Sequence, residues 1–238
     1  MNRRQLIVVA LLFFSSVPLL AQQRQDKPSA SASGQFSRLA PGESGKDSEP
    51  QPVVTHHEVR AGGKVLHYAA TAGLMPIRTT DGEIEANIFF IAYTLDGQNV
   101  EHRPLTFAFN GGPGSSAVWL HLGAMGPRRV KLQAEGLMPA PPYHLVDNEF
   151  TWLGQTDMVF IDPVGTGYSR AVKSDLKKKF FATKEDVESV GEFIRLYLGR
   201  YERWSSPLFL VGESYGTGAP LGCPGIWSSR ASPSTGSF

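Results

Sequence analysis

Residues 208–216 read LFLVGESYG, and this stretch predicts both a strand and a chemistry. Its first four residues are apolar and favour a buried strand. The Gly-x-Ser-x-Gly pattern that follows is typical of a sharp turn between a strand and a helix. Such a turn presents its serine, here Ser214, as a nucleophile. The sequence therefore predicts a strand that ends in a catalytic elbow.

A second glycine-rich turn lies upstream and reads NGGPGSS over residues 110–116. It joins an apolar strand predicted over residues 104–109 to a helix that can start in residues 117–122. A strand, a glycine turn and a helix N-terminus point several N–H groups at one spot, which suits an anion or an oxyanion. An ordinary tight turn and a phosphate-binding loop are the alternatives, but no Gly-Lys-Ser/Thr follows the glycines. Together with the elbow, the turn is best interpreted as an oxyanion hole.

The N-terminal half of the folded region predicts a β-meander. β-branched and aromatic residues alternate or cluster over residues 53–60, 64–71 and 83–95, and glycine turns separate these runs. Residues 157–161 are a further apolar strand, which runs into DPVGTGYS over residues 162–169. This loop lacks the third glycine of a dinucleotide fingerprint, so a nucleotide site is not expected there.

A helix is predicted after this loop, with Thr183 and Asp186 as a capping box at its start. An apolar stripe at helical spacing indicates packing against a sheet rather than a cofactor surface. The stripe consists of Val187, Val190, Ile194, Tyr197, Leu198 and Tyr201. The order of strands and helices favours an α/β fold with a mostly parallel sheet that is covered on both faces.

Composition excludes several classes of protein. The chain has 238 residues, of which 41% are hydrophobic, and this is enough for one globular domain. A net charge of +1 gives no reason to expect a nucleic acid or an anionic membrane surface as a partner. The single cysteine, Cys223, excludes an internal disulfide. We expect no metal and no cofactor, and the sequence does not indicate an oligomeric state.

The N-terminus predicts export. Residues 1–21 contain two arginines, an apolar stretch over residues 6–14 and a small-residue cleavage site, as a signal peptide does. The stretch is shorter than the about 20 apolar residues of a membrane-spanning helix. We therefore expect a periplasmic or extracellular protein without stable membrane insertion after cleavage, with an uncleaved anchor as the alternative. Residues 22–52 are rich in Ser, Gln, Pro, Gly and Ala and predict a disordered linker.

Three segments resemble, in the same order, the signature segments of the serine carboxypeptidase family, peptidase family S10. They are residues 110–127, 162–169 and 212–216, and the resemblance covers about residues 53–217. It implies an α/β-hydrolase fold, of which this chain holds the N-terminal part. It also implies release of C-terminal residues from peptides or proteins through an acyl-enzyme. Because a fold alone does not select a substrate, another acyl-transfer activity on this scaffold stays open.

The resemblance assigns roles at six positions. Ser214 would be the nucleophile, and the backbone N–H groups of Gly112 and Tyr215 would stabilise the oxyanion, by about 2.7–4 kcal/mol per donor. The substrate's free carboxylate would be held by Asn110, Gly111 and Glu213.

Two positions depart from the family pattern. Ala124 stands where relatives have a second carboxylate-binding glutamate, and Ser115 stands where many have a disulfide-forming cysteine. The latter resembles a bacterial branch of the family.

The end of the sequence conflicts with the α/β-hydrolase fold that the resemblance implies. Residues 218–225 read GAPLGCPG, a stretch that no helix tolerates, although the elbow should open a helix. All six histidines precede Ser214 and are interpreted as surface or packing residues, whereas the family places its triad aspartate and histidine after the serine. We therefore expect residues 218–238 to be an aberrant, frameshifted tail on an incomplete and inactive carboxypeptidase. The alternative is an exported, non-catalytic module that binds peptide carboxylates.

Overall fold

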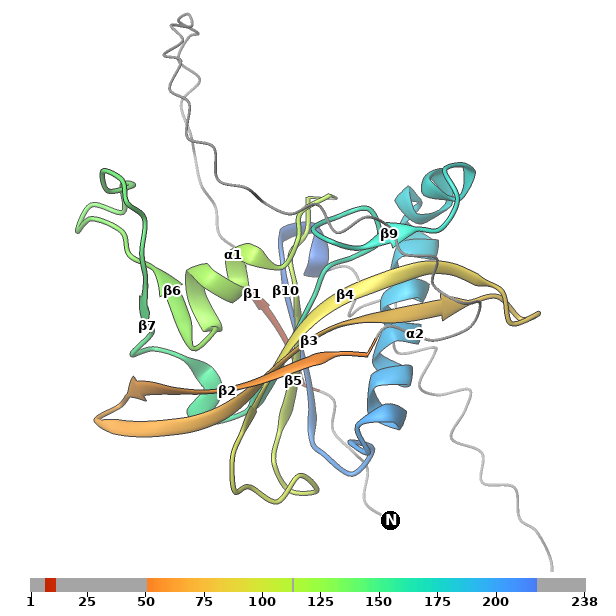
Figure 1. The fold of residues 1–238 in the computed structure, drawn as a ribbon. Coiled ribbons are helices and arrows are strands. Elements are labelled where there is room, and N and C mark those ends of the chain that lie inside the picture. Colours follow the sequence, from red (N-terminus) through yellow and green to blue (C-terminus); the bar gives the residue numbers. More distant parts are fainter. Residues whose placement is uncertain (1–6, 12–50, 113, 218–238) are drawn as a thin grey trace, which may run out of the picture. The chain divides into compact units, whose positions relative to one another are not determined.

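The computed structural model describes residues 7–11, 51–112 and 114–217 (Figure 1). The predicted tail lies outside these residues, as does all but the end of the predicted linker. In chain order the elements are β1 (Ile7–Leu11), β2 (Val53–Ala61), β3 (Lys64–Arg78), β4 (Ile84–Leu95), β5 (Leu105–Phe109), α1 (Val118–Leu120), the π-helix η1 (His121–Met125), β6 (Arg128–Val130), β7 (Leu145–Asp147), η2 (Trp152–Gly154), β8 (Asp157–Ile161), β9 (Arg170–Ala171), η3 (Asp175–Phe181), α2 (Thr183–Arg200), β10 (Leu208–Glu213) and η4 (Ser214–Thr217).

Strands β2, β3 and β4 form the predicted antiparallel meander. Gly62 and Gly63 turn the chain between β2 and β3 with φ of 56° and 74°, a region that glycine enters without steric cost. β3 continues past the predicted run to Arg78, because its second half still pairs with β4. The antiparallel part of the prediction is confirmed.

Strands β8, β5 and β10 form the parallel part of the sheet. The strand order is β1-β10-β5-β8-β4-β3-β2, and β9 adds to β4. β5 and β8 are buried along their whole length, as expected for parallel strands with both faces covered. β8 has the bounds that the sequence predicted. The predicted class, an α/β-hydrolase fold in which a meander leads into parallel strands, is confirmed for the described residues.

Strand β1 lies parallel to β10 at the edge of the sheet, with Ile7 opposite Phe209 and Leu11 opposite Glu213. These residues belong to the segment for which the sequence predicts a signal peptide; its cleavage stays a prediction. In the part of the chain that the structure describes, no helix is long and apolar enough to cross a membrane.

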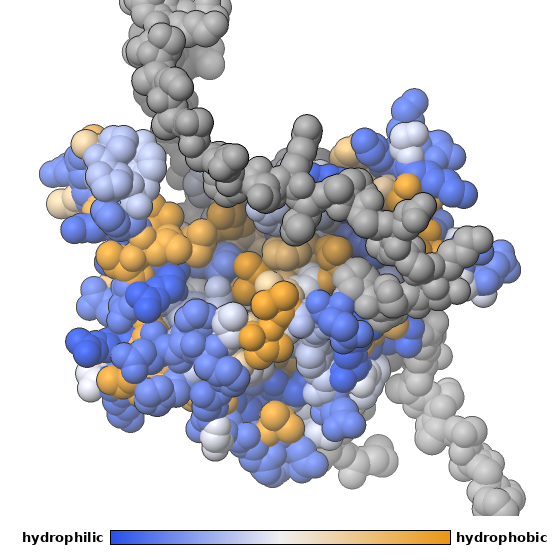
Figure 2. Space-filling model, viewed as in Figure 1, coloured by the Kyte–Doolittle hydropathy of each residue, from blue (hydrophilic) through white to orange (hydrophobic). Residues whose placement is uncertain are grey.

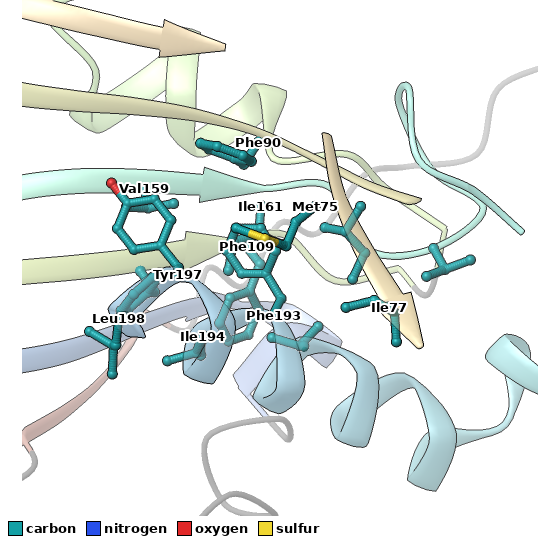
Figure 3. Close-up of a cluster of buried hydrophobic side chains, with 14 of the residues drawn as sticks. Met75, Ile77, Phe90, Phe109, Val159, Ile161, Phe193, Ile194, Tyr197 and Leu198 are labelled. Carbon is teal, nitrogen blue, oxygen red and sulfur yellow. The ribbon is translucent and has the colours of Figure 1, made fainter. Parts of the chain in front are cut away.

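The side chains of the central strands alternate between two cores, one on each face of the sheet. Phe107 and Phe109 face α2, whereas Ala108 between them belongs to the core beside α1. The predicted apolar stripe of α2 is buried against the first face, where Tyr197 meets Phe90 edge-on (Figure 3). Each fully buried side chain of this size contributes about 1.5–3 kcal/mol. The packing interpretation of the stripe is confirmed.

The predicted capping box is wrong. The N-cap of α2 is Ala182, whose carbonyl accepts the N–H of Asp186 at 3.0 Å, and no side chain caps the helix. Thr183 is already inside the first turn, so its hydroxyl does not stand at the cap position. Main-chain geometry, not the local motif, sets this boundary.

The helix expected to start in residues 117–122 does so, but it is short. After Leu120 the chain widens into a π-turn that closes with Gly126 N–H bonded to His121 O at 3.0 Å. A Cβ at position 126 would lie 2.3 Å from that oxygen. Only glycine therefore allows this closure.

The surface carries hydrophobic residues in separate patches rather than on one broad face in the view of Figure 2. Strands β6 and β7 form a separate two-stranded sheet, which the sequence did not predict, and their connection carries exposed apolar residues. Leu137 and Met138 are among them.

Candidate active site

The register of two parallel strands brings the predicted carboxylate-binding residues together. Gly212 of β10 lies opposite Phe109 of β5, so the next residues, Glu213 and Asn110, share the carboxyl edge of the sheet. Asn110 Nδ2 donates a hydrogen bond to Glu213 Oε2 at 3.3 Å. Gly111 is buried directly after Asn110.

Ser214 stands at the turn that follows β10 and has φ of 55°. A residue with a Cβ rarely adopts this left-handed conformation, and it marks a strained turn. Ser214 is exposed. Two residues on, Gly216 packs so closely on β5 that a Cβ there would lie 3.0 Å from Phe109 O. The sequence LFLVGESYG thus folds as a tight strand-to-helix turn against the end of β5.

The glycine-rich loop turns sharply at Gly112, whose φ is 124°. A Cβ at this position would lie 3.0 Å from Gly114 N, and Ser115 N donates to Gly111 O at 3.0 Å. Gly112 follows β5, and Tyr215 lies in η4 after the neighbouring strand β10. The two residues predicted to supply oxyanion donors therefore follow adjacent parallel strands; their role stays a prediction.

The amide of Asn110 is held at both ends. Its Oδ1 accepts the backbone N–H of Leu120 at 3.2 Å, while its Nδ2 points to Glu213. The side chain is buried, with 3% of its surface exposed. Because a helix N–H occupies the amide oxygen, the amide N–H₂ group is directed to the site.

Asp162 is a residue at this edge that the sequence analysis did not single out. It follows β8, is buried, and accepts Ala117 N–H at Oδ1 (2.9 Å) and Tyr168 N–H at Oδ2 (3.3 Å). Burial raises the pKa of Asp162, and the two N–H donors and the charge of Arg170 act in the opposite direction. Its signal in the sequence was an acidic residue directly after an apolar strand, at the edge that Asn110 and Glu213 share.

A small pocket opens beside the glycine loop. It is lined by Asn110, Gly111, Val164, Phe180, Phe181 and Asp186, among others. Burial raises the pKa of Asp186 to about 6. The pocket therefore combines apolar walls with one carboxyl group, that of Asp186, whose pKa lies well above that of a free aspartate.

His121 is a packing residue, as predicted. Its Nε2 lies 2.6 Å from Tyr93 Oη, and its ring stacks on Phe160 at 4.6 Å. Burial lowers the pKa of His121 to about 4, so the ring is neutral near pH 7. The other five histidines, all described, are exposed.

Ala124 lies in η1, where its carbonyl accepts Asn148 Nδ2 at 2.8 Å. Among the residues that the structure describes, no group of three or more His, Cys, Asp or Glu side chains could hold a metal ion.

Comparisons with known proteins identify relatives of this chain. A family model described as serine carboxypeptidase matches residues 63–219. Serine carboxypeptidase-like 9 of Arabidopsis thaliana is 29% identical over 171 residues, which cover 68% of this chain and 38% of the relative. The pheromone-processing carboxypeptidase KEX1 of Saccharomyces cerevisiae is 33% identical over 159 residues, which cover 60% of this chain and 20% of the relative. The chain thus spans well under half the length of these curated relatives.

Solved structures are also similar to this chain, and one of them is an α/β-hydrolase of yeast. The peroxisomal α/β-hydrolase Lpx1 of Saccharomyces cerevisiae is 15% identical and superposes with a TM-score of 0.36. The superposition covers 75% of this chain and 41% of Lpx1.

Proposed function

Because the chain belongs to the serine carboxypeptidase family, we propose that it carries the nucleophile and the carboxylate-recognition residues of a serine-type carboxypeptidase. The proposed reaction releases C-terminal residues from peptides or proteins. The observation that carries the proposal is the Asn110–Glu213 contact next to the left-handed turn at Ser214. A hydroxyl and a carboxylate-binding pair at adjacent strand ends suit attack on the last peptide bond of a chain.

In the proposed first step, Ser214 Oγ attacks the carbonyl carbon of the last peptide bond, and the carbonyl π electrons move onto its oxygen. The N–H groups of Gly112 and Tyr215 would receive this oxyanion, each worth about 2.7–4 kcal/mol in the transition state. The carbonyl then re-forms as the C–N bond breaks, the departing nitrogen takes the proton that Ser214 Oγ has given up, and Ser214 holds the acyl group as an ester. Water releases the acyl group in the second step.

Recognition of the free C-terminus follows from the same edge of the sheet. Asn110 Nδ2 and the backbone N–H of Gly111 are donors for a carboxylate. Glu213 can contact the carboxylate only if the two carboxyl groups share a proton, because two like charges repel. The proposed site has one glutamate where the family pattern has two, since Ala124 replaces the second.

Recognition can be tested without turnover. We would titrate the S214A variant with a tetrapeptide that has a free C-terminus and with its C-terminal amide, by calorimetry. The free acid is expected to bind at least tenfold more tightly, about 1.4 kcal/mol. N110A should remove this preference, whereas E192Q, which alters the α2 pair of Glu192 and Arg195, should keep it. Equal affinity for both peptides would contradict the proposal.

A non-catalytic carboxylate-binding module is the second candidate. It is favoured by the position of His121, which is buried in the core against Tyr93 and Phe160. We propose that the 238-residue chain reacts slowly with a fluorophosphonate, with S214A as the blank. Rapid labelling at Ser214 would show that the chain itself activates the serine and would exclude the binding module.

We also propose that the protein is exported, on the arginine and apolar pattern of residues 1–21. Mass spectrometry of the protein from its own cells tests this point. A mature N-terminus close to residue 22 is expected, and an N-terminus at Met1 would contradict it.

A further inference from the structure

The loop over residues 162–169 is one of the three segments that mark the family, yet the proposed reaction gives it no task. It lies beside the glycine-rich loop. We propose that Asp162 is a positioning residue that orients Asn110 through helix α1, and so shapes the carboxylate site. This inference rests on the proposed function.

The first link joins Asp162 to the start of α1. Asp162 Oδ1 accepts the N–H of Ala117, the residue before the helix, at 2.9 Å. Both residues are buried. A bond from an ionised acceptor to a backbone N–H is short and strong, so it fixes where the helix begins.

The second link joins the end of α1 to Asn110. Leu120 is the last residue of this short helix, and its N–H binds Asn110 Oδ1 at 3.2 Å. Asn110 Nδ2 then faces Glu213 Oε2. A shift of α1 therefore releases the amide of Asn110, because the same helix is held by Asp162 at one end and holds Asn110 at the other.

Hydrogen bonds within the loop of residues 162–169 fix the position of Asp162. Ser169 Oγ donates to Asp162 O at 2.6 Å and accepts Phe89 N–H from β4 at 2.7 Å. Arg170 Nη1 donates to the carbonyls of Gly167 and Ser169 at 2.8 and 2.7 Å. These bonds tie the loop to the neighbouring strand and to itself.

Gly167 is required for the position of the carboxylate. A Cβ at this residue would lie 1.7 Å from Asp162 Oδ2 and 3.1 Å from Ser116 Cβ in the glycine-rich loop. The backbone of Gly167 also has φ of 44°. Any side chain at position 167 would therefore displace Asp162 and press on the glycine-rich loop.

Burial argues against a role in stability alone. An ionised carboxylate in a buried place costs free energy, and the raised pKa of Asp162 reflects this cost. The N–H donors of Ala117 and Tyr168 and the charge of Arg170 offset only part of it. In return, the carboxylate of Asp162 fixes the positions of the N–H groups of Ala117 and Tyr168.

The test compares three changes in an S214A background. D162A removes both acceptors; D162N keeps an acceptor for Ala117 but sets an N–H₂ group against Tyr168 N–H; G167A displaces an unchanged Asp162. D147N is the matched control, because Asp147 also accepts a backbone N–H, from Arg60 at 3.0 Å, but touches neither loop. The readouts are amide hydrogen exchange at Ala117, urea unfolding, and the affinity ratio of the free-acid and amide tetrapeptides.

We expect at least tenfold faster exchange at Ala117 in D162A and G167A, and at least a tenfold drop in the affinity ratio. D162N should lie between these variants and the parent, and D147N should match the parent in exchange at Ala117 and in the affinity ratio. A residue with only a structural role would lower the urea midpoint and leave the affinity ratio of the folded protein unchanged.

An unchanged affinity ratio in folded D162A or D162N overturns the inference. If the parent itself does not prefer the free acid, the proposed function fails. In that case exchange at Ala117 still decides the link from Asp162 to α1, and unchanged exchange in D162N and D162A refutes it.

Discussion

Strand β8 is bracketed by two buried aspartates in opposite surroundings. Asp157 is its first residue, and Asp162 follows its last. Asp157 faces two arginine side chains at the amino end of the parallel strands, whereas Asp162 is bonded to backbone N–H groups at the carboxyl end. A buried carboxylate is therefore stabilised in two different ways at the two ends of the same strand.

The amino end is held by a network of charges. Asp157 Oδ1 binds Arg103 Nε, and Oδ2 binds Arg203 Nη1, both at 2.7 Å. Arg203 Nη2 donates to the carbonyl of Arg103 at 3.1 Å, and Leu95 N–H donates to Asp157 Oδ1 at 3.0 Å. The network joins the chain before β5, the start of β8 and the chain before β10.

The two ends of β8 differ in what their buried aspartate does: Asp157 holds the fold together, whereas Asp162 lies beside the proposed site. At the amino end, side-chain charges compensate one another and need no ligand. At the carboxyl end, backbone N–H groups bind Asp162, while Glu213 at the end of β10 is half-exposed and Ser214 is exposed. Breaking a buried ion network carries a high cost in stability, because it leaves a buried charge without its partner. The proposed carboxylate site lies at the other end, where no such network stands.

The largest effect should come from breaking the amino-end network. D157N leaves Arg103 and Arg203 buried without a counter-charge, and we expect the free energy of unfolding to fall by about 3–5 kcal/mol. Urea denaturation at pH 7 measures this. E192Q, which breaks the half-exposed pair with Arg195, should cost less than about 1 kcal/mol. A loss below about 1 kcal/mol for D157N would erase the contrast between the two ends.

A smaller effect concerns the free energy of unfolding at acidic pH. It depends on His121 in the π-turn that follows α1, next to the carboxyl end of the parallel strands. A free histidine titrates near pH 6.5, whereas His121 in the fold has a pKa of about 4. Between these values the unfolded chain takes up a proton that the native chain refuses, so stability falls as pH drops, by about 3 kcal/mol in total. H121F should flatten the slope of the urea midpoint between pH 7 and 4, and H102Q, at an exposed histidine, should not. Parallel slopes for H121F and the parent would refute this.

The smallest effect concerns Asp186 in the pocket beside Asn110. Burial raises its pKa from 3.8 to about 6, so the native state favours the protonated form and loses stability as pH rises through this window. D186N mimics the protonated form. After allowance for partial exposure we expect a gain of about 1 kcal/mol at pH 7 and none at pH 4, by urea denaturation. A loss at pH 7 would mean that the helix dipole, which favours a negative charge in the first turn, outweighs burial.

The carboxyl end was the more predictable of the two. The family resemblance assigned Asn110 and Glu213 to one site, and in the structure they meet because the parallel strands β5 and β10 end at the same edge of the sheet. Local patterns gave the bounds of β8 and the buried stripe of α2. These signals are periodic and need no knowledge of distant partners.

The amino-end network was not predicted, because its bonds join residues far apart in the chain. Arg103 and Arg203 lie in connections of mixed polarity, where a charge is normally solvated. The available signal was Asp157, an acidic residue that opens an otherwise apolar strand. The capping box failed for a different reason: Thr183 and Asp186 fit a local rule, but the N-cap is Ala182, so Thr183 is already the first residue of the helix.

The left-handed backbone of Ser214 also affects how this chain would evolve in the laboratory. With φ of 55°, a residue that bears a Cβ is strained, and glycine at this position would relieve on the order of 1 kcal/mol. A library selected for thermal stability alone should therefore enrich S214G. Stability favours glycine at this residue, whereas the proposed reaction requires serine. A selection for stability would therefore have to keep the codon for Ser214 unchanged.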